Sequence, residues 1–477
     1  MKKALLFTLV FVLLLLSGNA QAQIDGTLDT SFVIGTGFNS APVTTVLQPD
    51  GKILVGGSFS NYNGINRNRI IRLNTDGSLD TSFIIGTGFD DTVYTIELQS
   101  DGKILVGGNF TSYNDIPKNR IVRLNTDGSL DTSFTMGDGF STPGGMSFVL
   151  TIARQADGKI LVGGRFAKYN GSNQQNIARL NADGTADTSF YIATAPRFNF
   201  DVNVIVLQTD GKILAGGSFT SYSSTNQNYI ARLNTNGTLD TSFNIGTGFG
   251  GSLSGSVIRS IAVQPDGKVL VGGYFTTYKG IAQNRIVRLN TTGSVDTSFA
   301  IGAGIDNFFV ETIALQSDGK ILLGGGFTSY NGISKNRIVR LTSSGNIDTS
   351  FNTGIGFDNP VASISIQPDG KILVAGYFSN YKGLAQKQIA RLNGTGTLSV
   401  MDVSKKAIVF YPNPINDVLN FSEEVSNIKI TDISGKVVTK VSAKRKSVNV
   451  SNFVKGIYFV TATTKSGEMI SNKIVKE

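Results

Sequence analysis

The sequence of 477 residues predicts an all-β fold, a seven-bladed β-propeller closed by its N-terminal strand and followed by a small C-terminal β-sandwich. Three observations support this prediction. A unit of about 50 residues occurs seven times, each unit contains two hairpin signals, and the two ends of the repeat region complement each other. The 56 glycines agree with it, because short strands joined by tight turns accommodate glycine better than helices do.

The repeat is marked by the turn Asp-Gly-Lys, and successive turns are 51 to 56 residues apart. The turns begin at Asp50, Asp101, Asp157, Asp210, Asp266, Asp318 and Asp369. Each unit also carries, in some form, a Gly-rich run that ends in Phe, the triplet Arg-Leu-Asn and the sequence Asp-Thr-Ser-Phe. A fixed period of this length indicates a repeat architecture and exceeds the coil length of a parallel β-helix.

Each unit is expected to form one blade. In the first unit, residues 43–48 and 52–59 flank Pro49-Asp50-Gly51, a turn in which Pro sets φ and Gly adopts the left-handed conformation. Residues 69–74 and 79–85 flank Asp76-Gly77, a strong signal for a tight hairpin. Four strands per unit follow, which is one propeller blade.

The ends of the repeat region predict how the ring closes. Asp-Thr-Ser-Phe at residues 29–32 precedes the first Asp-Gly-Lys turn, whereas the last unit runs to Leu398 without this sequence. We expect residues 25–32 to complete the last blade near Leu392, which removes both exposed sheet edges. The propeller is thus predicted to span residues 23–399.

The repeat resembles the delta-60 repeat family, whose propeller-like modules occur in exported bacterial proteins. The resemblance rests on the run Gln-x-Asp-Gly-Lys-Ile-Leu-Val-Gly-Gly-x-Phe at residues 48–59 and on Arg-Leu-Asn…Leu-Asp-Thr-Ser-Phe at residues 72–83. It covers residues 25–398. It implies a propeller in an exported protein and no defined activity.

Residues 1–22 are interpreted as a secretory signal peptide. Lys2 and Lys3 precede an apolar stretch at residues 4–16, and Ala20-Gln21-Ala22 is a cleavage site of the A-x-A type, with cleavage after Ala22. The apolar stretch is shorter than the roughly 20 residues that cross a bilayer. We therefore expect no transmembrane segment.

The pattern changes after a linker at residues 400–407. Residues 408–477 alternate strand signals, among them 418–421 and 428–433, with polar turns, which predicts a small β-sandwich. This region resembles the type A sorting domain of the type IX secretion system through Tyr411, Pro412, Asn413, Pro414, Leu419, Gly435, Lys436, Gly456 and Tyr458. The resemblance implies that the secretion machinery is a partner. It also implies a protein that is secreted or held at the outer-membrane surface of a Gram-negative bacterium.

The composition excludes several kinds of site. The chain has no Cys and no His, so it offers no disulfide and lacks the commonest general base and transition-metal ligand. Of the net charge of +9, Lys2 and Lys3 supply two and the region from Asp402 onward supplies five. A net charge of only +2 remains on the central region, so we expect no nucleic-acid partner.

Repeated polar residues are interpreted as scaffold. The spacing Asn74-x-Asp76-Gly77-x-x-Asp80 suits a short Ca²⁺ loop, but Asn, Thr or Ser replaces the middle Asp in later units, which hairpin chemistry explains better. The repeated arginines are expected to have packed stems and paired heads, and not to form an anion pore. They are Arg72, Arg123, Arg179, Arg232, Arg288, Arg340 and Arg391. We expect no cofactor, no metal site and no catalytic residue.

The segments that break the repeat supply the candidate binding site. The connections after Asp-Thr-Ser-Phe vary in length and should emerge on one face of the ring, where rigid scaffolds present function. Aromatic and Arg side chains dominate interface energetics. The candidate contacts for an extracellular protein or glycan are therefore Tyr191, Arg197, Phe198, Phe200, Phe308 and Phe309.

Three alternatives to this non-enzymatic binding module stay open. The loop phenylalanines can pack inward as core residues. An extracellular hydrolase can use Asp and Glu side chains at the propeller mouth, although the only two propeller glutamates, Glu97 and Glu311, have no partner in the sequence. A purely structural surface protein is the third.

Overall fold

The computed structural model describes residues 24–190, 197–251, 255–394, 410–411, 414–433, 436–464 and 469–477. These residues form two compact units, one that ends at Gly394 and one that begins at Phe410. Some residues predicted to have a role lie outside the described ranges, namely Ala22, Tyr191, Pro412, Asn413 and Gly435.

The first blade is an antiparallel sheet with the strand order β1-β2-β5. β1 (Pro42–Leu47) and β2 (Ile53–Gly57) flank the predicted turn, and β5 (Ile70–Leu73) pairs with the other edge of β2. Every residue of β2 and β5 is buried, because neighbouring blades cover both faces of these strands.

The predicted fourth strand at residues 79–85 is reduced to a single bridge between Leu79 and Leu73. Asp80 ends the pairing, since its Oδ1 accepts hydrogen bonds from the backbone N–H and the hydroxyl of Ser82, at 3.0 and 2.7 Å. An Asp that bonds the backbone two residues further on folds the chain into a turn. The strand prediction was therefore too long at this place.

Each blade also has a small outer hairpin that the repeat pattern did not predict. In the first blade β3 (Asn61–Tyr62) pairs with β4 (Ile65–Asn66) across Asn63 and Gly64, whose φ angles are 50° and 80°. Two positive φ values are typical of a tight hairpin turn. The Tyr62 hydroxyl donates to the carbonyl oxygen of Gly77 at 2.6 Å, which ties the hairpin to its blade.

The other six blades repeat this arrangement. Their three main strands are β6 (Val93–Leu98), β7 (Ile104–Gly108) and β10 (Ile121–Leu124); β12 (Phe148–Arg154), β13 (Ile160–Arg165) and β16 (Ile177–Leu180); β17 (Val202–Leu207), β18 (Ile213–Gly217) and β21 (Ile230–Leu233); β23 (Val257–Val263), β24 (Val269–Tyr274) and β27 (Ile286–Leu289); β28 (Val310–Leu315), β29 (Ile321–Gly325) and β32 (Ile338–Leu341); β33 (Val361–Ile366), β34 (Ile372–Gly376) and β37 (Ile389–Leu392). The outer elements are β8 (Ser112–Tyr113), β9 (Ile116–Pro117), β11 (Phe140–Ser141), β14 (Lys168–Tyr169), β15 (Ser172–Asn173), the 3₁₀ helix η1 (Thr188–Phe190), β19 (Ser221–Tyr222), β20 (Thr225–Asn226), β22 (Phe249–Gly250), β25 (Thr277–Tyr278), β26 (Ile281–Ala282), β30 (Ser329–Tyr330), β31 (Ile333–Ser334), β35 (Asn380–Tyr381) and β36 (Leu384–Ala385).

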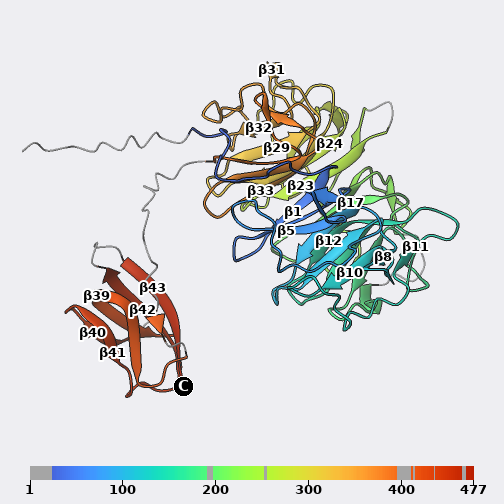
Figure 1. The fold of residues 1–477 in the computed structure, drawn as a ribbon. Coiled ribbons are helices and arrows are strands. Elements are labelled where there is room, and N and C mark those ends of the chain that lie inside the picture. Colours follow the sequence, from blue (N-terminus) through green and yellow to red (C-terminus); the bar gives the residue numbers. More distant parts are fainter. Residues whose placement is uncertain are drawn as a thin grey trace, which may run out of the picture. The chain divides into compact units, whose positions relative to one another are not determined.

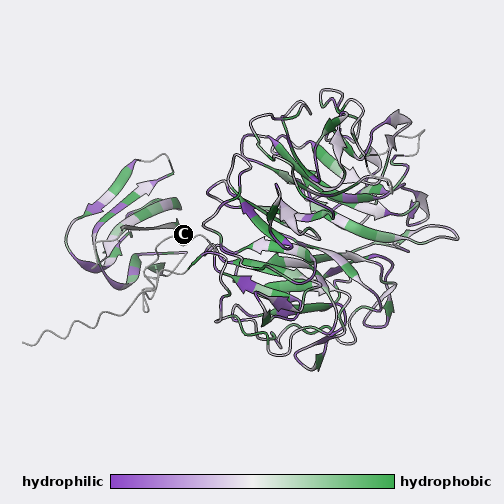
Figure 2. Cartoon of the chain, turned by 90° about the horizontal axis from the view of Figure 1, so that it is seen from above, coloured by the Kyte–Doolittle hydropathy of each residue, from purple (hydrophilic) through white to green (hydrophobic). Residues whose placement is uncertain are grey.

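The first strands of the seven blades contact one another in a closed ring, from β1 through β6, β12, β17, β23, β28 and β33 back to β1. In Figure 1, β1, β17 and β23 lie at the centre of the propeller, whereas β8, β11 and β31 lie at its periphery. The core lies between blades: one cluster combines Leu54 and Ile70 of the first blade with Phe110 and Val122 of the second. Figure 2 shows the apolar residues concentrated on the strands.

The N-terminal segment completes the last blade, as predicted. Leu28 forms a bridge with Leu392 of β37, and the backbone N–H of Asp29 donates to the carbonyl oxygen of Arg391 at 2.8 Å. The Asp29 Oδ2 also accepts a hydrogen bond from the Arg391 Nε at 2.6 Å. Both ends of the repeat region thus share one blade, and the ring is closed.

The C-terminal unit is one six-stranded sheet that closes over a core in the manner of a sandwich. Its strands are β38 (Phe410–Tyr411), β39 (Val418–Asp432), β40 (Val437–Val441), β41 (Arg445–Asn449), β42 (Gly456–Thr464) and β43 (Met469–Lys476). The two predicted strands at 418–421 and 428–433 are a single strand, β39, with an irregular stretch between Asn420 and Val425. This irregularity bends β39, so that β41 and β40 pair with its opposite ends.

The described residues of the predicted sorting motif lie on three strands of this unit or beside strands, with Leu419 on β39 and Lys436 just before β40. Tyr411 on β38 and Pro414 are exposed, whereas Tyr458 on β42 is buried and its ring packs 5.0 Å from that of Phe453. Gly456 begins β42. Among the described residues of the whole chain, no helix is long and apolar enough to cross a membrane.

Candidate binding site on the propeller axis

Every first strand carries a β-bulge near its beginning. In β1, Pro42 lies opposite Gly57 and Thr44 lies opposite Gly56, so Val43 has no residue opposite it. Glycine is required at position 57, because a Cβ there would lie 2.3 Å from the carbonyl oxygen of Ala41. A bulged residue is released from the ladder and its side chain is redirected.

The seven bulged residues all line one cavity of about 890 Å³. They are Val43, Tyr94, Leu150, Asn203, Arg259, Glu311 and Ala362. Because the first strands form a closed ring, a cavity lined by one residue from each strand lies on the propeller axis. We name it the axial mouth. Its volume falls within the range of about 300–1,000 Å³ that is typical of small-ligand sites.

The residues that line the axial mouth differ from blade to blade, although the scaffold around them repeats. The bulge position holds seven different residue types in seven blades. The position after the second glycine of the Gly-rich run also varies, and there Arg165, Ser218 and Tyr377 reach the cavity. This position stands between a glycine and a phenylalanine that are the same in all seven blades.

In five of the seven blades, the residue two positions before the bulge, in the connection or at the start of the strand, supplies a third set of lining residues. These residues are Phe148, Asp201, Val257, Phe309 and Pro360. The connections that vary in length therefore lead directly into the axial mouth.

A row of contacts runs across one part of the mouth, from the second blade to the fourth. The ring of Tyr94 meets that of Phe148 edge-on, with the centroids 6.1 Å apart. The guanidinium of Arg165 lies 5.2 Å from the centroid of Phe148, and its Nε and NH2 donate to the two carboxylate oxygens of Asp201 at 2.7 and 2.6 Å. A bidentate pair of this kind fixes both side chains.

Arg259 and Glu311 form a much looser pair. Their nearest atoms, NH1 and Oε1, are 3.9 Å apart, and the side chains are 47% and 30% exposed. This distance is too long for a direct hydrogen bond, so both groups can still bind another partner. Burial raises the pKa of the Glu311 carboxyl above its ordinary value, and the charge of Arg259 opposes this rise.

The structure separates the residues that were predicted as ligand contacts. Phe309 lines the axial mouth. Phe200 and Phe308, which immediately precede mouth residues in the sequence, are 56% and 50% exposed. The prediction is wrong for Arg197 and Phe198, which are 4% and 0% exposed and so cannot offer a surface to a ligand.

The two buried residues belong to the scaffold. The ring of Phe198 lies 4.2 Å from that of Phe219 and 4.6 Å from that of Tyr222, in the place that Phe38 holds in the first blade. Arg197 donates through NH2 to the carbonyl oxygen of Phe190 at 2.8 Å. A signal for Phe198 was present, since an aromatic or Ile residue stands at this point of every repeat.

Sequence reasoning missed most of the axial mouth. The bulge residues and the residue after the second glycine look like ordinary variable positions inside strands. The position after the second glycine is distinguished by the invariant glycine and phenylalanine that flank it. The bulge positions have variable neighbours, and only the ring topology shows that all of these positions meet.

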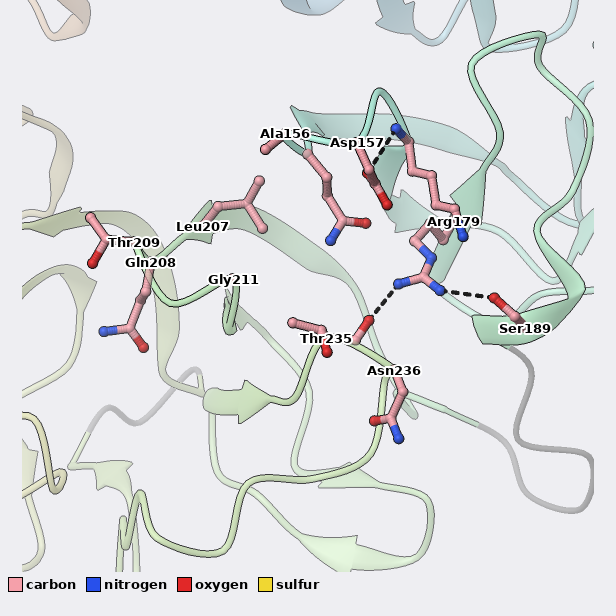
Figure 3. Close-up of a pocket in the computed structure, with 12 residues that line it drawn as sticks. Ala156, Asp157, Arg179, Ser189, Leu207, Gln208, Thr209, Gly211, Thr235 and Asn236 are labelled. Carbon is pink, nitrogen blue, oxygen red and sulfur yellow. Dashed lines mark hydrogen bonds between the residues drawn. The ribbon is translucent and has the colours of Figure 1, made fainter. Parts of the chain in front are cut away.

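The repeated arginines bind the blades to one another, with paired heads as predicted. The Nε of Arg232 donates to the Oδ2 of Asp240 at 2.7 Å, and its NH1 donates to the carbonyl oxygen of Thr291 in the next blade at 2.7 Å. Figure 3 shows the same arrangement where Arg179 donates to Ser189 and to Thr235 of the following blade. The cleft drawn there is lined by residues of the repeat, so it is a feature of the scaffold.

Other candidate chemistry finds little support within the described ranges. No group of three or more acidic side chains among these residues could hold a metal ion. In the candidate Ca²⁺ loop, the Oδ1 of Asp76 accepts hydrogen bonds from the N–H and hydroxyl of Ser78 at 2.9 and 2.6 Å. Glu97 stands three residues beyond its bulge, about 10 Å further along its strand at the usual rise per residue, and burial raises its pKa to about 7 against the charge of Arg154. Glu97 and Glu311 thus lie at different depths.

Two family models match the chain. The model described as Domain of unknown function (DUF5122) beta-propeller, which is the delta-60 repeat family, matches residues 48–83, 99–134, 155–190, 208–243, 264–299, 316–351 and 367–398. These segments together cover more than half of the chain. Residues 409–477 match the secretion system C-terminal sorting domain. A comparison with curated proteins found no match.

Several solved structures are similar to this chain. PorZ, a bacterial surface component of the type IX secretion system of Porphyromonas gingivalis, has 15% identity and a TM-score of 0.41 over 92% of this chain and 60% of PorZ. The extracellular domain of a putative hybrid two component system from B. thetaiotaomicron has 14% identity and a TM-score of 0.43, over 94% of this chain and 56% of that one. An inactive virginiamycin B lyase from Staphylococcus aureus has 15% identity and a TM-score of 0.41, over 76% and 97%. The chain spans less than two thirds of the length of the first two.

Proposed function

Since the chain belongs to the DUF5122 beta-propeller family and ends in a type IX sorting domain, we propose that its propeller binds an extracellular ligand at the axial mouth and catalyses no reaction. The sorting domain directs the protein to the type IX secretion machinery. The protein is therefore exported, to the outer-membrane surface of a Gram-negative bacterium or into the medium.

One observation carries the proposal: seven positions whose residue type differs in every blade converge on one cavity. The bulged residue differs in every blade, yet all seven bulged residues line the same cavity. A scaffold position with a packing or turn role repeats, as the arginines and the Gly-rich runs do. Positions that differ while sharing one concave surface are those expected of a recognition site.

The proposal against catalysis rests on the carboxylates of the mouth. Both of them, Asp201 and Glu311, face an arginine, and the bidentate bond from Arg165 holds Asp201 in place. A glycosidase of the usual kind needs one free general acid and one free base or nucleophile on opposite sides of the bond. Glu97, the other propeller glutamate, lies deeper than the mouth.

The test compares the full chain from residue 23 with the double variant Tyr94→Ala/Arg259→Ala. The probes are the outer-membrane fraction and the culture-medium polymers of the producing bacterium, and binding is measured by co-sedimentation and on a biosensor. Removing an aromatic and an arginine from a recognition site should weaken binding at least tenfold, which corresponds to about 1.4 kcal/mol.

The matched control is Phe459→Ala/Arg445→Ala, which removes an aromatic residue and an arginine from exposed positions of the C-terminal unit outside the sorting motif. It should bind like the parent. Equal binding by the mouth variant, or no binding by the parent to either probe, would refute the proposal. Release of reducing sugar from the probes that stops in Glu311→Gln would instead support the hydrolase.

A further inference from the structure

The bulged residues on the two sides of the axial mouth differ in chemical character. Following the ring from the seventh blade through the first to the third, the bulged residues are Ala362, Val43, Tyr94 and Leu150. The next three blades contribute Asn203, Arg259 and Glu311. At the bulge position, four adjacent blades thus present largely apolar side chains, which we call the apolar wall, although Arg165 of the third blade also lines the mouth there, held by Asp201. The three adjacent blades opposite present a planar amide, a cation and an anion, which we call the polar wall.

Aromatic rings extend the apolar wall. Phe148 lies beside Tyr94 and leads to the bulge of the third blade. Tyr377 of the seventh blade also lines the mouth and is 54% exposed. Two tyrosines of the mouth, the half-buried Tyr94 and the exposed Tyr377, therefore flank the first blade, where Val43 lies at the bulge.

Among the described residues, the polar wall keeps hydrogen-bonding capacity for a ligand. Arg259 and Glu311 are 3.9 Å apart and partly exposed. Arg259 can only donate hydrogen bonds, whereas an ionised Glu311 can only accept them. Asn203 uses its Nδ2 in a hydrogen bond to the carbonyl oxygen of Ile258 at 3.0 Å, which fixes its amide plane beside this pair.

From this division we infer that the ligand is a glycan and that the mouth binds one of its sugar rings. The inference rests on the proposed binding function. A pyranose ring has a face of C–H groups, which packs on aromatic rings, and an edge of hydroxyls that both donate and accept. One hydroxyl accepts from Arg259 while its neighbour donates to Glu311, so a vicinal diol satisfies both side chains at once.

The shape of the site favours a sugar over a folded protein partner. A stable protein interface buries about 800 Å² on each partner, over a surface that is usually flat. The axial mouth is a concave cavity of about 890 Å³, a size that suits a small ligand or the end of a polymer. The sugar is therefore placed with its C–H face on Tyr94 and its hydroxyl edge towards the fourth to sixth blades.

The experiment treats the outer-membrane fraction and the medium polymers either with periodate, which cleaves the carbon–carbon bond of vicinal diols, or with protease. Binding of the full chain to each treated probe is then compared. Periodate should reduce binding at least tenfold. Binding lost to both treatments marks a glycan carried on protein and also supports the inference. Binding that survives periodate overturns it, whatever the protease does.

Conservative variants test the role of each wall. Tyr94→Phe keeps the ring, so its affinity for the probes should stay within about threefold of the parent's. Tyr94→Ala should lower the affinity at least tenfold, which corresponds to about 1.4 kcal/mol. Arg259→Met keeps most of the side-chain volume, and its affinity should fall at least tenfold because the hydrogen-bond donors are missing. Phe459→Ala and Arg445→Met, at exposed positions outside the sorting motif, are the matched controls, and melting curves check that all variants are folded.

The outcomes separate this inference from the proposed function. If mouth variants weaken binding but periodate does not, the mouth binds a ligand that is not a glycan, and only the inference fails. If mouth variants bind like the parent, the proposed function itself fails.

Discussion

Deleting residues 24–32 removes the segment that closes the propeller, and its contacts set the size of the effect. The buried carboxylate of Asp29 pairs with Arg391 and Lys371 at 2.6 and 2.9 Å, and Asp25 pairs with the fully buried Arg340 at 2.7 Å. Leaving one partner of a buried ion pair behind costs about 3–5 kcal/mol, and loss of the buried ring of Phe32 costs about 3–5 kcal/mol more. The total, on the order of 10 kcal/mol, equals the whole stability of a typical domain.

The truncated chain should therefore fail to form a stable propeller, and the exposed edge of β37 should promote association. Urea denaturation followed by circular dichroism measures the first effect, and light scattering measures the second. Asp29→Ala provides a graded version, with an expected loss of about 3–5 kcal/mol, and Thr30→Ala is the control, because Thr30 is exposed. A truncated chain that unfolds at the same urea concentration as the parent would show that closure does not depend on this segment.

Three further predictions concern acid stability, the loop aromatics and export. Burial raises the pKa of Asp29, but hydrogen bonds from Ser31 and Lys371 and the charge of Arg391 outweigh this effect and lower the pKa to about 2. Since the pKa in the unfolded chain is about 3.9, Asp29 contributes about 2 kcal/mol to the free energy of unfolding above pH 4, and this contribution should fade as the pH falls from 4 towards 2. Equal urea midpoints at pH 6 and pH 2.5 would contradict this prediction. Phe198→Ser should lower the free energy of unfolding by several kcal/mol, because a core Phe→Ala change costs about 3–5 kcal/mol. Phe200→Ser should leave the melting temperature nearly unchanged. Similar losses of stability in both variants would place Phe200 in the core as well. Removing all residues after Lys406 should leave the protein in the periplasm, as cell fractionation would show, and normal appearance of the truncated protein in the medium would be evidence against the sorting assignment.

The scaffold was predictable because its determinants are local and repeat seven times. The Asp50 turn and the Asp76-Gly77 hairpin each specify backbone conformation within four residues, and the incomplete last unit implied the role of Asp29. The length of the fourth strand was not predictable from strand propensity alone. The Asp80 side chain, through its bonds to Ser82, overrides that propensity after a single bridge.

Of the predicted ligand contacts that the structure describes, only Phe309 lines the axial mouth. Irregular connections do lead into the axial mouth, as Phe309 shows. Phe198 was misassigned because an aromatic residue inside an irregular loop was weighed as a loop residue, although it occupies a repeated core position. Tyr94 and Arg259 could not be selected beforehand, since their proximity depends on the closed ring and not on any spacing along the chain.

The bulge explains how a nearly symmetric scaffold can form an asymmetric site. Most residues of the first three strands of a blade have a partner in the ladder or pack against the next blade, which constrains the residue type in all seven copies. The bulged residue has no residue opposite it, as Val43 shows, and the close approach at Gly57 keeps the backbone in place whatever the bulged side chain is. Seven such positions can therefore change independently with little cost to the fold. Because ring closure brings all seven to one axis, independent changes at these positions add up to a single composite surface, on which Tyr94 and Glu311 come to lie in the same cavity.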